Sequence, residues 1–113
     1  MWSNGSFRDV LITATRADSA LLRYCKLRTV VFDGCNLQGT DFQFAELTGV
    51  RFEQCDLTGA QWAHAKLSNV VFDACTLLDM GGATSLAGAT VRGPGALELA
   101  LGLARESGIV IEP

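Results

Sequence analysis

Apolar side chains recur at every fifth position along most of this chain. The series begins at Trp2 and Phe7 and runs unbroken to Leu77, with 16 members. A second series of small residues, such as Val30 and Cys35, stands two positions before each member. A five-residue period fits neither an α-helix of 3.6 residues per turn nor the two-residue alternation of a flat strand. The chain must therefore turn a corner every five residues.

Residues 20 positions apart also resemble one another, which is expected if four corners close one coil of a solenoid. Such residues would lie above one another in successive coils. The predicted columns are Phe32, Phe52 and Phe72; Leu27, Leu47 and Leu67; Leu37, Leu57 and Leu77; and Cys35, Cys55 and Cys75. Identical side chains stacked at the strand spacing of about 4.8 Å pack without voids. We therefore predict an all-β solenoid with these columns as its core.

The repeat itself resembles that of the pentapeptide-repeat family, which reads roughly A-[DN]-L-x-x. The best matches are CNLQG at 35–39, AELTG at 45–49 and CDLTG at 55–59. The resemblance covers about residues 1–92. It implies a right-handed quadrilateral β-helix, which agrees with the two nested periods.

The repeat register changes after Leu77. The next centre would be Gly82, but apolar centres reappear at Leu86 and Val91. We predict a register break at about 78–85, a β-helix over residues 1–92 and a separate C-terminal element over 93–113. Residues 94–107 are expected to form a helix, with Pro94 in its first turn and a glycine as its C-cap.

The predicted helix is apolar around nearly its whole circumference, which indicates burial on more than one side. Its apolar residues are Leu97, Leu99, Ala100, Leu101, Leu103 and Ala104. One side is expected to cap the solenoid. The family resemblance implies that the other side joins two copies in a homodimer, with the tail 109–111 available as an edge strand. The alternative is a helix that only folds back over its own solenoid.

Composition excludes several classes of protein. With 49% apolar and 19% charged residues the chain is not a disordered tail. A net charge of −3 argues against direct nucleic-acid binding. No apolar run is long enough to span a membrane, and no secretory signal is visible. Four cysteines without a signal indicate free thiols in a reducing compartment, so we predict a cytoplasmic protein.

Nothing in the sequence predicts catalysis, a cofactor, a metal site or a small-molecule substrate. Cys35, Cys55 and Cys75 occupy the inward small-residue positions, and a straight column of thiols cannot supply tetrahedral metal coordination. His64 is the only histidine, and a convex rod offers it no orienting neighbour and no substrate pocket. We interpret the thiols as core residues and the protein as non-enzymatic.

Two outward columns are candidate partner surfaces. One is acidic (Asp33, Glu53 and Asp73), and the other is aromatic (Tyr24, Phe44 and His64). The family resemblance implies that such a rod can mimic duplex DNA, bind DNA gyrase and affect quinolone susceptibility. However, residues 1–93 hold nine acidic and eight basic residues, a net of only −1, whereas duplex DNA carries one charge per about 1.7 Å.

The sequence therefore favours a macromolecule-binding or scaffold module with an unknown partner. One alternative is a DNA mimic directed at gyrase. Another is a truncated or engineered scaffold that has no partner.

Overall fold

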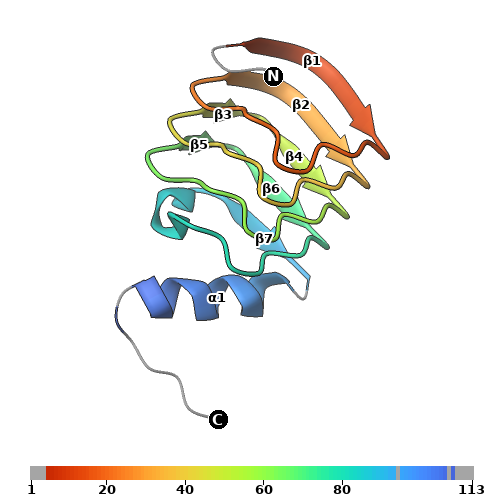
Figure 1. The fold of residues 1–113 in the computed structure, drawn as a ribbon. Helices are drawn as coiled ribbons and strands as arrows, with labels where there is room; N and C mark the ends of the chain where they lie inside the picture. The colour runs from red at the N-terminus through yellow and green to blue at the C-terminus, as the bar shows by residue number, and fades with distance from the viewer. Residues whose placement is uncertain (1–4, 94, 107, 109–113) are drawn as a thin grey trace.

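The computed structural model describes residues 5–93, 95–106 and 108 and shows stacked parallel coils with one helix across their C-terminal end (Figure 1). Trp2, Pro94 and the tail 109–111 lie outside the described residues. The elements are β1 (Ser6–Thr13), β2 (Lys26–Asp33), β3 (Glu46–Thr48), β4 (Arg51–Glu53), β5 (Lys66–Ser68), β6 (Val71–Asp73), the 3-10 helix η1 (Ala83–Leu86), β7 (Thr90–Arg92) and α1 (Gly95–Glu106). The predicted all-β solenoid with a C-terminal helical cap is confirmed.

Strand pairing follows the predicted 20-residue period. Phe32 of β2 pairs with Phe52 of β4, which pairs with Phe72 of β6, all in parallel. On the adjacent side Leu27 pairs with Leu47 and then with Leu67 in the same way. Strands β1 and β2 run across two sides of the coil, whereas later coils divide the same path into two short strands.

The chain turns a corner at every fifth residue, and the residue at each corner has a left-handed backbone conformation. The first such residues in the described chain are Asp9, Ala14, Ser19 and Tyr24, with φ between 46° and 63°. Glycine, which adopts this conformation without steric penalty, occupies some later corners, including Gly34 with φ 65°. The period of five therefore reflects one left-handed corner per repeat.

The polar residue before several repeat centres closes a small local turn. Oδ1 of Asn36 accepts the backbone N–H of Gln38 at 3.1 Å, and Oδ1 of Asp56 accepts that of Thr58 at 3.0 Å. These are Asx-type bonds, which explain why Asn and Asp precede these repeat centres. Burial alone would raise the pKa of Asp56, but the hydrogen bonds from Thr58 and Gln38 outweigh it and hold that pKa below its usual value.

Stacked side chains fill the interior. Phe52 lies between Phe32 and Phe72, with ring centroids 5.0 and 4.9 Å away, and meets Phe42 and Trp62 edge to face. All residues of the four predicted columns are buried except Leu67, which is partly buried. Leu67 is more open because β5 is the last strand on its side of the sheet in the described part of the chain.

The last coil is one residue shorter than the others. Gly81 still pairs with Gln61 at a spacing of 20 residues, whereas Val91 pairs with Phe72 at a spacing of 19. The residue is lost around η1, which begins after Gly82 in the left-handed region. A Cβ at Gly82 would lie 2.4 Å from the backbone nitrogen of Ala63, so only glycine fits this close approach.

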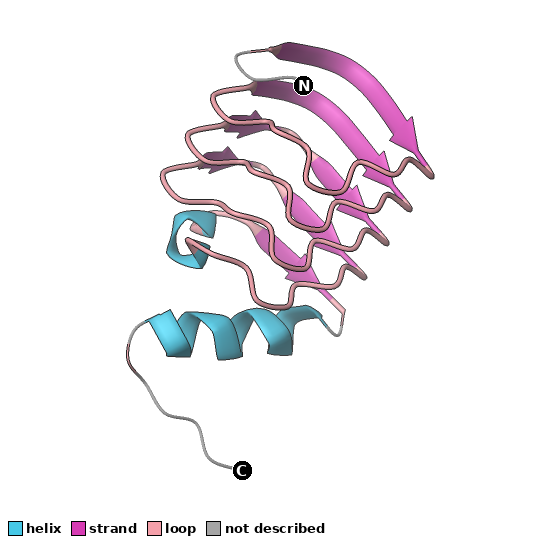
Figure 2. Cartoon of the chain, viewed as in Figure 1, coloured by secondary structure: helices cyan, strands magenta, loops and turns pink. Residues whose placement is uncertain are grey.

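Helix α1 lies across the last coil (Figure 2) and replaces the hydrogen-bond acceptors that a further coil would supply. The N–H of Leu57 donates to the carbonyl of Thr76 in the next coil at 2.9 Å. Leu77 has no such coil above it, and its N–H donates to Oε1 of Glu98 on α1 at 2.9 Å. Oε1 of Glu106 accepts the N–H of Ala83 at 3.2 Å. The helix thus caps the solenoid with two carboxylates.

Candidate interaction surfaces

The aromatic column forms a continuous stack on the outside of the solenoid. The rings of Tyr24 and Phe44 are 4.9 Å apart and inclined by 9°, and those of Phe44 and His64 are 4.8 Å apart and inclined by 17°. Tyr24 is 50% exposed and Phe44 41%. The sequence predicts the column, and the structure brings its three rings into direct contact.

All three rings stand on left-handed corners. Their φ values are 63° for Tyr24, 60° for Phe44 and 62° for His64. This conformation costs an L-residue about 1–2 kcal/mol, and large side chains are rare in it. Each stacked ring pair contributes about 0.5–1.5 kcal/mol. The two stacked pairs therefore offset part of what the three corners cost, and they hold the exposed rings in a fixed orientation.

The acidic column carries less unpaired negative charge than its three acidic residues suggest. Asp33, Glu53 and Asp73 stand in register on β2, β4 and β6. Glu53 accepts hydrogen bonds from Nε and Nη2 of Arg51 at 3.1 and 3.0 Å. Beyond Asp73 the next residue in register is Arg92. Among the described residues, the column therefore holds two carboxylates that form no ion pair, Asp33 and Asp73, and between them the neutralised Glu53.

The thiol column belongs to the core. Cys35, Cys55 and Cys75 are free and buried, and each Sγ donates to a carbonyl oxygen of the preceding coil at 3.1–3.3 Å. Contact with the Cys75 thiol, together with burial, raises the pKa of the Cys55 thiol. A protonated thiol is a poor nucleophile and a poor metal ligand, and this argument applies to Cys55, because contact with Cys55 lowers the pKa of the Cys75 thiol. Among the described residues, no group of three or more His, Cys, Asp or Glu side chains could hold a metal ion.

Comparison with known proteins shows that these columns belong to a known type of repeat protein. The profile of the pentapeptide repeat region matches residues 2–62, more than half of the chain. The protein belongs to the pentapeptide-repeat family. No curated protein sequence matches it.

Solved structures of QnrB1, a plasmid-mediated fluoroquinolone resistance protein, are similar in fold to this pentapeptide-repeat protein. A trypsin-treated variant matches with a TM-score of 0.56 and 13% identity, over 96% of this chain and 84% of that one. Full-length QnrB1 matches with a TM-score of 0.47 and 19% identity, over 78% of this chain and 42% of that one. At these identities the likeness concerns the fold.

Helix α1 of the pentapeptide-repeat protein has a covered side and an open side. Leu99 and Leu103 pack against the core, and Ala104 is buried. Leu97 is 69% exposed and Leu101 41%, and the exposed Ala100 lies near them in sequence. The predicted interface residues are therefore divided between the cap and the free surface.

No helix among the described residues is long and apolar enough to cross a membrane.

Two features of this pentapeptide-repeat protein escaped the sequence analysis. The carboxylates of Glu98 and Glu106 complete the last coil, but a glutamate on a helix has no pattern that marks it as a backbone acceptor. Arg8 and Arg28 gather on one side of the coil. Arg8 and Arg28 are 20 residues apart, and this spacing predicts that they share one column, just as it predicts the acidic and aromatic columns.

Proposed function

We propose that this protein is a non-enzymatic protein-binding module and that the aromatic column is its contact surface. The observation that carries the proposal is the exposed stack of Tyr24, Phe44 and His64 on left-handed corners. Exposed, rigid aromatic side chains are the residues that most often dominate binding energy at protein interfaces. The core is filled by aromatic and aliphatic side chains, which leaves it no room for a substrate. Buried free thiols fit the reducing compartment that the sequence predicts.

The aromatic column is tested by removing its rings while keeping its corners. Tyr24→Asn and Phe44→Asn retain a residue that tolerates the left-handed region. We expect the double variant to bind a partner captured from a lysate of the source cell more than about tenfold more weakly than the parent protein, as measured by calorimetry. Replacing Asp33, Glu53 and Asp73 by Ala is expected to leave that affinity unchanged.

Leu11→Ala is the matched control, because Leu11 is 66% exposed and lies on β1, outside the aromatic column. A partner whose affinity survives the loss of both rings would refute the aromatic column as the contact surface. If the folded protein captures no partner, the third reading, a scaffold without a partner, is supported instead.

A second candidate function is DNA mimicry directed at DNA gyrase. It is favoured by the register of Asp33, Glu53 and Asp73 and by the fold likeness to a fluoroquinolone resistance protein. The test is a gyrase supercoiling assay across a titration of the protein. Inhibition that disappears when the three acids are replaced by Ala would support mimicry. Unchanged supercoiling in the presence of well-folded protein would exclude it.

We also propose that two copies associate through the open side of α1. Leu97→Lys with Leu101→Lys is expected to convert a dimer to a monomer in light scattering, because it places two charges in an apolar contact. Both side chains are exposed in the single chain, so the circular dichroism spectrum is expected to remain that of the parent. Leu11→Lys introduces one lysine on β1, at an exposure comparable to that of Leu97, and should leave the dimer intact. A dimer that persists in the helix variant contradicts this interface.

A further inference from the structure

One side of the solenoid is basic although the chain as a whole is acidic. We call it the basic face and define it by the outward side chains of residues 6–9, 26–29, 46–49 and 66–69. It carries four basic and two acidic residues, a net of +2 on a chain with a net charge of −3. The basic residues are Arg8, Lys26, Arg28 and Lys66, and the acidic ones are Asp9 and Glu46.

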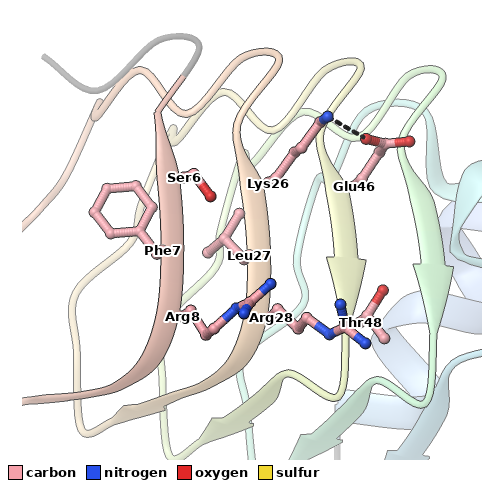
Figure 3. A pocket seen from close by; sticks show the side chains of 8 residues that line it. All are labelled: Ser6, Phe7, Arg8, Lys26, Leu27, Arg28, Glu46 and Thr48. Carbon is pink, nitrogen blue, oxygen red and sulfur yellow. Dashed lines mark ion pairs between the residues drawn. The ribbon is translucent and has the colours of Figure 1, made fainter.

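A hollow of about 380 Å³ opens on the basic face across β1, β2 and β3 (Figure 3). Figure 3 shows the guanidinium groups of Arg8 and Arg28 on one side of it, with Thr48 beside them. Lys26 and Glu46 lie on the other side, with Nζ and Oε2 4.0 Å apart. The hollow is therefore lined by three cations, one carboxylate and two hydroxyl groups, together with Phe7 and Leu27.

Arg8 and Arg28 are in register on adjacent strands, and among the described residues neither takes part in an ion pair or side-chain hydrogen bond. Like charges directly opposite each other destabilise a sheet. The neighbouring column avoids this repulsion, because Lys26, Glu46 and Lys66 alternate in sign. An anion placed between the two guanidinium groups would relieve the repulsion.

We propose that the basic face binds an acidic segment of a partner protein, with one carboxylate on Arg8 and a second on Arg28. The guanidinium group matches a carboxylate with two parallel hydrogen bonds. The two arginines start from strands about 4.8 Å apart. Acidic residues at alternate positions of an extended segment place carboxylates about 7 Å apart, which the long arginine side chains can span.

The composition of the basic face favours an acidic peptide over a nucleic acid. Phe7, which is partly buried against the core, is the one aromatic residue among those that line the hollow, so a run of unpaired bases would find a single ring and no row of stacking surfaces. Asp9 and Glu46 interrupt the cations, which would repel a continuous phosphate backbone. This inference does not rest on the aromatic column, because that column lies on a different side of the coil.

Fluorescence anisotropy with labelled peptides tests the proposal. A peptide of alternating Glu and Ser is expected to bind, with an affinity that falls as salt is added, whereas a peptide of alternating Gln and Ser is not. Arg8→Gln with Arg28→Gln is expected to weaken binding of the Glu-Ser peptide by about tenfold or more, since it removes two charge-assisted pairs. Circular dichroism checks that the variant is folded.

The matched control is Arg16→Gln with Arg92→Gln, which removes the same net charge from other sides of the coil. We expect it to change the affinity less than about twofold, because charges that far away are largely screened at physiological salt. Equal losses in the two double variants, or no binding of the Glu-Ser peptide, would overturn the proposal.

Two further arms decide the partner class. Duplex or single-stranded DNA that binds the same residues more tightly than the Glu-Ser peptide would replace the acidic segment with a nucleic acid. Arg8→Glu with Arg28→Glu is expected to reverse the preference, so that this variant binds a Lys-Ser peptide instead. Failure of that reversal in a folded variant also counts against the proposal.

Discussion

Phe52→Asp is expected to prevent folding. Phe52 is 0% exposed and lies between two stacked phenylalanine rings. A carboxylate there would be buried without a partner and would interrupt the central aromatic column. We expect a loss of at least about 5 kcal/mol, which is comparable with the whole stability of a small domain. The measurement is the β-rich circular dichroism signal of the purified variant.

Two controls separate burial from side-chain chemistry. Phe52→Leu keeps an apolar side chain and is expected to cost about 1–3 kcal/mol in urea unfolding while leaving the fold intact. Tyr24→Asp introduces the same carboxylate at an exposed corner, where it remains hydrated. It is expected to fold like the parent. A folded Phe52→Asp protein would show that the register of the coil is wrong.

Removing residues 94–113 is expected to give a solenoid that aggregates or remains monomeric. The deletion uncovers the apolar end of the last coil and leaves the N–H groups of Leu77 and Ala83 without their glutamate acceptors. Water can reach these N–H groups once the helix is gone, so each lost hydrogen bond costs only about 0.5–1.5 kcal/mol, and the exposed apolar end is expected to be the larger loss. Light scattering and urea unfolding measure the two effects. A soluble dimer after the deletion would contradict the proposed association through α1.

Substitution of Glu98 separates the contribution of one capping hydrogen bond from the other effects of deleting residues 94–113. Glu98→Ala removes the acceptor of the Leu77 N–H and is expected to lower the free energy of unfolding by about 1–3 kcal/mol. Glu98→Gln keeps an oxygen that can accept the same hydrogen bond and is expected to lose less. Equal losses in the two variants would show that the carboxylate acts by its charge and not as a backbone acceptor.

Most of the fold could be predicted because every repeat forms the same local structure. Each repeat contributes one inward side chain and one left-handed corner, so the sequence period maps directly onto the geometry. The stacked partners of Phe52 followed from counting 20 residues in either direction. The same counting predicted that Tyr24, Phe44 and His64 would share a column.

The end of the solenoid could not be predicted in the same way. The period shows that the register changes, but it does not show which groups satisfy the last coil. That depends on how α1 docks, which brings Glu98 to Leu77 across 21 residues of sequence. The apolar residues of α1 were equally ambiguous, because both its sides are apolar and only docking separates Leu103 from Leu97.

The charged surfaces show a similar division. The sequence predicts that Asp33, Glu53 and Asp73 stand in one column, and the pairing of the strands agrees. Side-chain contacts then neutralise Glu53 through Arg51, whereas Arg8 and Arg28 stay unpaired within the described chain. These differences depend on the conformations of flexible side chains, which the spacing of residues in the sequence does not predict.

The sequence by itself therefore determined the solenoid, its core columns and the residues that share each outward column, because a strict period constrains the backbone at every repeat. Only the tertiary structure decided how the last coil is capped, which side of α1 stays open and which charges remain free. The first two outcomes depend on contacts between elements that do not repeat, and the third depends on which neighbours the individual charged side chains reach.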